Sequence, residues 1–153
     1  GRRLWAVGEK ARYEMREHAK LRAFELADAI AMDIYRETRR FPKEEVYGLS
    51  SQMRRAAVSI PSNIVEGCAR ESQVEYVRFL EIAFGSLREL NYPCSLARRL
   101  DYFEGEMSTA LFSKIAETEK VLGALLRSLR PRYIPTVYSR SPYSLIAENN
   151  TKT

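Results

Sequence analysis

Histidine is almost absent from this sequence, in which His18 is the only one. A di-metal site in a helical bundle needs glutamates from two helices and Glu-x-x-His from two others, and no Glu-x-x-His occurs here. Nucleophilic catalysis by serine or cysteine needs a neighbouring base, which a lone histidine at a helix edge does not offer. The seven glycines are scattered and form no phosphate-binding loop. We therefore expect a protein without enzymatic activity, metal or other cofactor.

Cysteines and long apolar runs are also scarce. Cys68 and Cys94 form no Cys-x-x-Cys pair and lie in apolar helical stretches, which is typical of reduced, buried thiols in a cytosolic protein. No apolar run approaches the roughly 20 residues that span a bilayer. Arg2 and Arg3 are followed by only four apolar residues before charge returns, so no signal peptide is visible. These absences predict a cytoplasmic location and no membrane partner.

The formal net charge of +5 is unevenly distributed along the chain. Residues 1–17 carry +2 and residues 127–153 carry +4, whereas residues 18–126 carry −1. Basic ends on a nearly neutral body argue for a nucleic-acid partner less strongly than a basic body would. Arginine outnumbers lysine by 19 to 6, and its forked guanidinium suits contacts to phosphate or carboxylate. Nucleic acid therefore stays a candidate partner.

Apolar residues recur at steps of three and four in four stretches, which predicts four helices. The first helix ends before Pro42, because the residue preceding a proline is driven out of the helical conformation. The third begins at Ser72 with Glu75 three residues later, the pattern of a capping box. The first, third and fourth predicted helices cover residues 18–40, 72–99 and 104–129. The second begins between residues 44 and 50 and ends near residue 67.

Short connections between helices of similar length favour antiparallel neighbours. We therefore predict an all-α fold, an antiparallel up-and-down four-helix bundle over residues 18–130. Residues 1–17 form an N-terminal extension in this interpretation. Residues 131–153 are rich in proline, tyrosine and small polar residues, and we expect an extended or disordered basic and aromatic tail.

The third predicted helix has more apolar surface than one bundle normally buries. Leu80 and Leu87 belong to one stripe, whereas Phe79, Ile82 and Leu90 fall outside it at about 100° per residue. Two interpretations stay open. The helix is covered by the chain ends, or it faces another subunit, in which case the bundles assemble into a homo-oligomeric ring.

Antiparallel threading brings a group of basic residues to one end of the bundle. The group consists of Arg36, Arg39, Arg40, Lys43, Arg54, Arg55, Arg98 and Arg99. Six acidic residues fall at the same end, and arginines at helix C-termini also complement the helix dipoles. The group is therefore either a solvated surface or a phosphate-binding site that is repeated around a ring.

Two further sets of residues are candidates for a role. Arg130, Arg132 and Tyr133 open the tail, where tyrosine stacking beside arginine would suit single-stranded nucleic acid. The alternative is a disordered tail or one packed on a neighbouring subunit. A structural polar network that fixes helix register is expected to include Asn63, Glu66, Arg70, Glu75 and Glu89.

The second and third predicted helices carry a long motif that resembles one protein family. Its first part is Phe41-Pro42-Lys43-Glu44-Glu45, Tyr47-Gly48-Leu49, Gln52, Arg54-Arg55-Ala56, Ser59-Ile60-Pro61, Asn63-Ile64 and Glu66-Gly67. Its second part is Arg70, Ser72, Glu75, Phe79-Leu80, Ile82-Ala83, Gly85-Ser86 and Glu89-Leu90. The motif is similar to that of the four-helix bundle proteins encoded in intervening sequences of 23S ribosomal RNA genes, over roughly residues 18–130.

This resemblance implies a four-helix bundle that assembles as a ring-like homopentamer without enzymatic activity. A related fold serves as the accessory protein of diversity-generating retroelements, where a pentamer binds a reverse transcriptase and nucleic acid. We therefore expect a homo-oligomeric protein associated with nucleic acid, in particular RNA. The alternative is a scaffold or accessory subunit for a protein partner such as a reverse transcriptase. Pro93, the tail and residues 1–17 depart from the family pattern, so nothing carries over to them.

Overall fold

The computed structural model describes residues 2–130, except the side chains of residues 2–6, 12, 13, 15, 16 and 18. Within this range the chain forms four α-helices and a short 3₁₀-helix, with no β-strand. The helices are α1 (Arg2–Thr38), α2 (Leu49–Cys68), α3 (Gln73–Arg99) and α4 (Met107–Leu129), and the 3₁₀-helix η1 (Lys43–Glu45) lies between α1 and α2.

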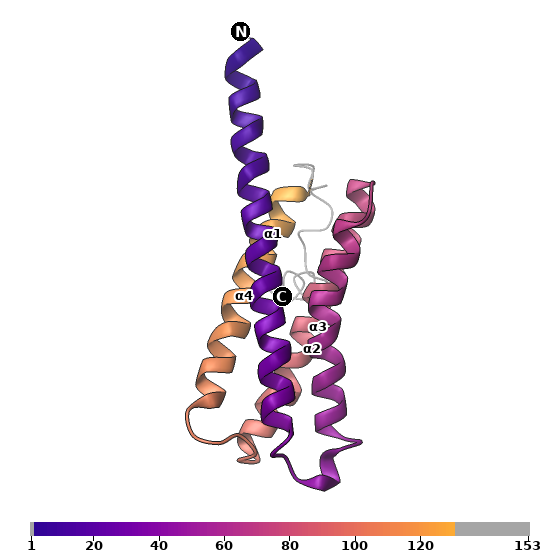
Figure 1. Ribbon diagram of the computed structural model, residues 1–153, viewed down its shortest axis with the longest axis vertical. Coiled ribbons are helices and arrows are strands. Elements are labelled where there is room, and N and C mark those ends of the chain that lie inside the picture. Colours follow the sequence, from indigo (N-terminus) through magenta and orange to yellow (C-terminus); the bar gives the residue numbers. More distant parts are fainter. Residues whose placement is uncertain (1, 131–153) are drawn as a thin grey trace, which may run out of the picture.

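The four helices run alternately up and down (Figure 1). α1 and α3 each pack against α2 and α4, whereas the diagonal pairs make no close backbone contact within the described residues. This arrangement confirms the predicted antiparallel four-helix bundle. The α1–α2 and α3–α4 connections lie together at what we call the loop end (residues 39–48 and 100–106). The α2–α3 connection and the last turn of α4 lie at the opposite end, the far end.

One apolar seam from each helix builds the core. On α4, Leu111, Ile115 and Leu122 recur at the predicted four-three spacing and are at most 2% exposed. Burying one such side chain contributes roughly 1.5–3 kcal/mol relative to leaving it exposed. Thr118 lies in the same seam, and its hydroxyl donates to the Lys114 carbonyl at 2.7 Å. The seam therefore contains no unsatisfied hydroxyl at this position.

The first helix is longer than the sequence predicts. It begins at Arg2, and not near His18, so residues 2–17 of the predicted extension continue α1 as a helix beyond the bundle (Figure 1). Apolar periodicity identifies helices that bury one face, and this stretch has little of it. Its residues nevertheless favour the helix, because glutamate, lysine, alanine, arginine and methionine predominate and proline is missing.

The last helix begins later than the sequence predicts. The backbone of Asp101 and Gly105 has positive φ, 58° and 55°, which no continuing right-handed helix contains. α4 therefore begins at Met107 and not at Glu104. The predicted start of α3 is confirmed, since Ser72 Oγ accepts a hydrogen bond from the Glu75 backbone N–H at 3.5 Å.

The apolar surface of α3 is smaller than the sequence analysis concludes. Leu90 is fully buried in the core, because the seam of α3 follows its own four-three spacing. Phe79 is half-buried, and the Arg70 guanidinium lies over its ring at 4.9 Å. Ile82, which is 41% exposed, is the member of the predicted excess that faces outward. An outward apolar face on α3 is therefore restricted to a few positions.

Candidate nucleic-acid interface

The loop end is held in place by one carboxylate and three aromatic rings. The Glu45 carboxylate accepts hydrogen bonds from the Leu49 backbone N–H at 2.9 Å and from the Tyr102 hydroxyl at 3.2 Å. The Phe41 ring packs against the rings of Tyr102 and Phe103, with centroid distances of 5.3 and 5.4 Å. These contacts tie the α1–α2 connection to the α3–α4 connection, so both present their side chains from a fixed backbone.

The predicted basic group lies in the last turn of α1 and the two residues after it, in η1, in the first two turns of α2 and in the last turn of α3. Two members pair with acids across the bundle. Arg40 Nη1 lies 2.9 Å from Glu104 Oε2, and Arg55 Nη2 lies 3.4 Å from Glu89 Oε1. Both pairs are exposed, so each contributes about 1 kcal/mol or less and can exchange its carboxylate for another anion.

Three more arginines of the group pack on neighbouring side chains. Arg54 Nε donates to Thr38 Oγ1 at 2.8 Å, and its guanidinium lies over the Tyr35 ring at 4.8 Å. The Arg98 guanidinium lies 5.1 Å from the Phe112 ring centre. The guanidinium of Arg36 lies 3.9 Å from an oxygen of Asp33, one turn earlier on α1. These arginines are therefore partly committed to stabilising the bundle.

Arg39, Lys43 and Arg99 remain. All three are exposed, and none pairs with an acid among residues 2–130. They come from the end of α1, from η1 and from the end of α3, so three elements each contribute one unneutralised charge to the loop end. A phosphate could bind them without first displacing a carboxylate. These three residues, which we call the free cations, are the strongest part of the predicted group.

Tyr47 is a loop-end residue that the sequence analysis did not select. Its side chain is 97% exposed, in the connection that also carries Lys43. An exposed aromatic ring beside basic residues can stack on an unpaired base. The exposure of Tyr47 could be predicted from the sequence, because the residue lies in a connection between helices and outside any apolar stripe that would bury it.

Glu37 is a buried acidic residue close to the loop end. It lies in the last turn of α1, is 3% exposed, and its Oε2 accepts no hydrogen bond from the described residues. A buried carboxylate oxygen without a partner lowers stability, because the water that solvated it has not been replaced. None of the described loop-end cations pairs with it.

The five residues predicted for a polar network do not lie together in one buried cluster. Glu66, in the last turn of α2, forms an exposed ion pair with Arg70, which lies two residues after that helix. Glu89 pairs with Arg55, and the side chain of Glu75 is exposed. Charged side chains of this kind stay in water unless burial gives them several partners, which explains the difference. Only Asn63 takes part in a half-buried network.

That network joins α2 to α3 through two serines that the sequence analysis passed over. Ser59 Oγ lies 2.8 Å from Ser86 Oγ, and Asn63 Nδ2 donates to Ser59 Oγ at 3.0 Å and to the Ser59 carbonyl at 2.7 Å. Ser86 Oγ also lies 3.0 Å from the Ile82 carbonyl. Small hydroxyls can lie between closely packed helices, and their spacing in sequence gives no distinctive pattern.

Of the three predicted tail residues, the structure describes one. Arg130 lies at the far end, where its Nη2 is 2.9 Å from Glu81 Oε1. Arg132 and Tyr133 lie outside the described residues. Arg130 and the loop-end group therefore belong to opposite ends of the bundle.

The thiols and the acidic side chains of the described residues form no metal-binding cluster. No group of three or more histidine, cysteine, aspartate or glutamate side chains among these residues could hold a metal ion. Burial raises the pKa of the Cys94 thiol to about 12, so this thiol stays protonated. Cys68, by contrast, is exposed and not buried as predicted, because it is the last residue of α2. None of the described helices is both long and apolar enough to cross a bilayer.

Comparisons with known proteins agree with this fold. The fold is similar to the crystal structure of a protein of unknown function from the S23 ribosomal protein family of Bacteroides thetaiotaomicron, with a TM-score of 0.61. The two chains are 22% identical, and the match covers 73% of this chain and 97% of the other. A comparison with curated proteins gave no match. The pattern of the 23S rRNA-intervening sequence proteins matches residues 19–124, which include all of α2 and α3, and the chain therefore belongs to that family.

Proposed function

We propose that the chain is a non-enzymatic, homo-oligomeric protein that binds RNA with the loop end of its bundle. The observation that supports this proposal most directly is the set of free cations, Arg39, Lys43 and Arg99, which are exposed at the loop end just after α1, in η1 and at the end of α3. Guanidinium groups form forked contacts with phosphate, and the free energy of such binding grows with the number of contacts. The family description, which names 23S rRNA intervening sequences, makes RNA the favoured nucleic acid.

The exposed ring of Tyr47 favours RNA with unpaired bases over a regular duplex. A-form RNA offers proteins its backbone and a shallow groove, whereas loops and single strands offer base faces for stacking. Stacking of one base on an aromatic side chain contributes about 1–3 kcal/mol. The free cations and Tyr47 together fit a single-stranded or looped segment.

Oligomerisation would repeat this small site. The outer surface between α1 and α2 has an apolar groove of about 460 Å³, lined by Leu21, Phe24, Val65 and Cys68 among others. Leu21 is 56% exposed and Val65 54%. Exposed apolar patches of this kind mark interaction surfaces in soluble proteins. We propose that α1 and α2, more than α3, provide the contact between subunits, in a ring such as a pentamer.

A salt titration of RNA binding tests the proposal. We expect a triple variant with Arg39, Lys43 and Arg99 each replaced by glutamine to bind a looped RNA at least tenfold more weakly at low salt. The slope of log affinity against log salt should become shallower by about 2, since each lost phosphate contact contributes about 0.7 for single strands. The charge-matched control replaces Lys10, Arg78 and Arg127, which are exposed but distant from the loop end, and should bind almost as tightly as the unchanged protein.

Equal loss in both triple variants would contradict a loop-end site, because only net charge would then matter. Affinity that is insensitive to salt and to both variants would instead favour the second candidate, an accessory subunit for a protein partner such as a reverse transcriptase. The α1–α2 groove is the surface that such a partner would use.

A further inference from the structure

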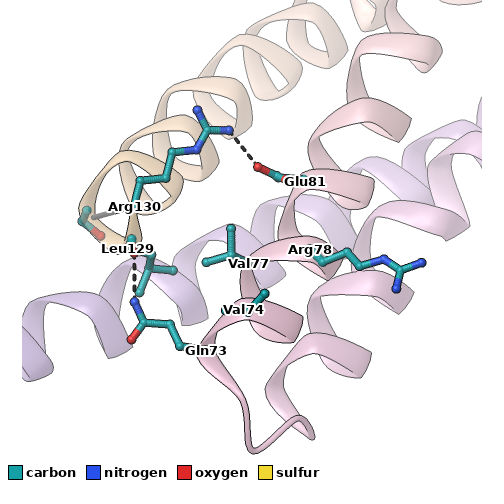
Figure 2. Close-up of a pocket in the computed structure, with 8 residues that line it drawn as sticks. Gln73, Val74, Val77, Arg78, Glu81, Leu129 and Arg130 are labelled. Carbon is teal, nitrogen blue, oxygen red and sulfur yellow. Dashed lines mark hydrogen bonds and ion pairs between the residues drawn. The ribbon is translucent and has the colours of Figure 1, made fainter. Parts of the chain in front are cut away.

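A second groove lies at the far end, between the first two turns of α3 and the last turn of α4 (Figure 2). It has a volume of about 620 Å³. Val74, Val77 and Leu129 form its apolar floor, and Val74 is 81% exposed. An aliphatic side chain this exposed at the mouth of a groove leaves apolar surface in contact with water, which favours an occupant.

Polar contacts hold the rim of this groove in a defined shape. Gln73 Nε2 donates to the Leu129 carbonyl at 2.9 Å, and Arg130 pairs with Glu81 across the two helices (Figure 2). The first contact satisfies a carbonyl at the end of α4 that has no partner within its helix. The two contacts fix α4 against α3, so the groove exists before anything occupies it.

The chain leaves α4 at the edge of this groove. Arg130, which lines it, has extended backbone angles, φ −72° and ψ 136°, and the next residue is Pro131. Proline has no N–H to continue the helical ladder. The stretch that follows, residues 133–138, reads Tyr-Ile-Pro-Thr-Val-Tyr, in which four of six side chains are apolar or aromatic.

We propose that residues 133–138 of the same chain, which lie outside the described residues, occupy the groove at the far end. Val74 and Glu81 are separated by two helical turns, about 10 Å, so three or four of these six residues span that length in an extended conformation. The segment begins only three residues after Arg130, so the entropy lost on closing the loop is small. Pro131 and Pro135 have a fixed φ, and a proline disfavours the helical region for the residue before it, so fewer conformations are lost on docking. The proposal is independent of RNA binding, since the groove and the loop end lie at opposite ends of the bundle.

Limited proteolysis of the full chain with trypsin tests the docking. Arg132–Tyr133 lies at the start of the proposed segment and Arg140–Ser141 lies beyond it. We expect slow cleavage after Arg132 in the unchanged protein, and at least tenfold faster cleavage in a Val74→Asp variant. Cleavage after Arg140 should not change and serves as an internal reference. Because Val74 is exposed and in the first turn of α3, aspartate there should not impair folding.

The matched control is Val58→Asp, at an exposed valine on α2 outside this groove. It should leave cleavage after Arg132 slow. Equal rates after Arg132 in the unchanged protein and in Val74→Asp would overturn the proposal, and so would acceleration by Val58→Asp.

A disulfide test identifies which chain supplies the segment. Val77→Cys and Ile134→Cys are combined in a Cys68→Ser background, so that no exposed native thiol competes. Mild oxidation should give a disulfide within one chain, read from the mass of a 1:1 mixture of isotope-labelled and unlabelled protein. A disulfide between labelled and unlabelled chains would overturn the same-chain assignment in favour of a second copy. Failure to form any disulfide would count against docking altogether.

Discussion

At the scale of single residues, Glu37 is the least expected feature of the bundle. Its position on the core side of α1 follows the apolar spacing of that helix, yet it is a carboxylate with one oxygen that no described group contacts. Surface side chains of α1 such as Glu25 remain in water and have no such cost. Glu37 therefore identifies a position where the sequence is not optimised for stability.

We expect Glu37→Met to raise the free energy of unfolding by about 1–2 kcal/mol, because an apolar chain of similar size removes the cost of burying an unsatisfied carboxylate. Chemical denaturation at a fixed protein concentration measures the change. Glu25→Met, at an exposed position of the same helix, should alter stability by about 0.5 kcal/mol or less. A loss of stability in Glu37→Met would mean that the carboxylate has a favourable partner and that the interpretation is wrong.

At the scale of elements, two glycines distinguish a packed helix surface from an open one. A Cβ on Gly67, the penultimate residue of α2, would lie 3.0 Å from Phe79 Cβ and 3.1 Å from Tyr76 Cδ2 on α3. A Cβ on Gly85, in the middle of α3, would meet nothing within 4 Å. The first glycine therefore permits α2 and α3 to approach, whereas the second only weakens its own helix.

Replacing these two glycines by alanine should change the free energy of unfolding in opposite directions. Gly67→Ala is expected to lower the free energy of unfolding by about 1–3 kcal/mol, because the clash with Phe79 Cβ cannot be relieved by a rotamer change. Gly85→Ala should raise it by about 0.5–1 kcal/mol, because alanine loses less backbone entropy in a helix. Guanidinium denaturation of both variants under identical conditions checks this. Similar stabilisation in both would refute the close approach of α2 and α3 at Gly67.

The existence and order of the helices could be predicted from sequence, but two of their boundaries could not. Apolar spacing reports burial, so it identified α2, α3 and the seam of α4 and passed over residues 2–17 of α1, where no apolar stripe is present. The left-handed backbone at Gly105, which falls inside the predicted helix, delays α4, and glycine by itself does not predict that conformation, because it adopts positive and negative φ alike. Ser72, whose side chain caps α3, was predictable because capping has a local sequence signature.

At the scale of the whole molecule, the sequence predicts where the candidate site lies but not which of its basic residues are paired with acidic residues. Antiparallel threading alone placed the basic group at one end. Which members are neutralised depends on residues distant in sequence, such as Glu104 opposite Arg40, and no local pattern encodes such pairs. The exposed apolar surface is likewise predicted on α3, because a stripe drawn at 100° per residue excludes Leu90, whereas the four-three spacing of a coiled-coil seam includes it.

The proposed assembly into a homo-oligomer depends on the apolar groove between α1 and α2. We expect the unchanged protein to have a mass in light scattering that is a multiple of 17.7 kDa. Leu21→Glu combined with Val65→Glu should reduce the mass to that of one chain and leave the helical circular dichroism unchanged. Both side chains are more than half exposed, so glutamate there does not disturb the core.

Ile82→Glu is the matched control, because it adds the same charge on the outer face of α3. It should leave the assembly intact. Dissociation by Ile82→Glu alone would place the contact on α3, which is one of the two interpretations of its apolar surface, and a single-chain mass for the unchanged protein would exclude a ring.

The start of α1 and the end of α4 lie on the side of the bundle opposite the loop end (Figure 1). This polarity has a practical consequence for immobilisation. A tag placed before α1 would anchor the protein to a sensor surface by its far end and leave the loop end facing the solution. The stretch 2–17 of α1 would then act as a rigid spacer of about 24 Å, at about 1.5 Å per residue. An oriented layer of this kind could be prepared without altering a single residue of the proposed RNA site.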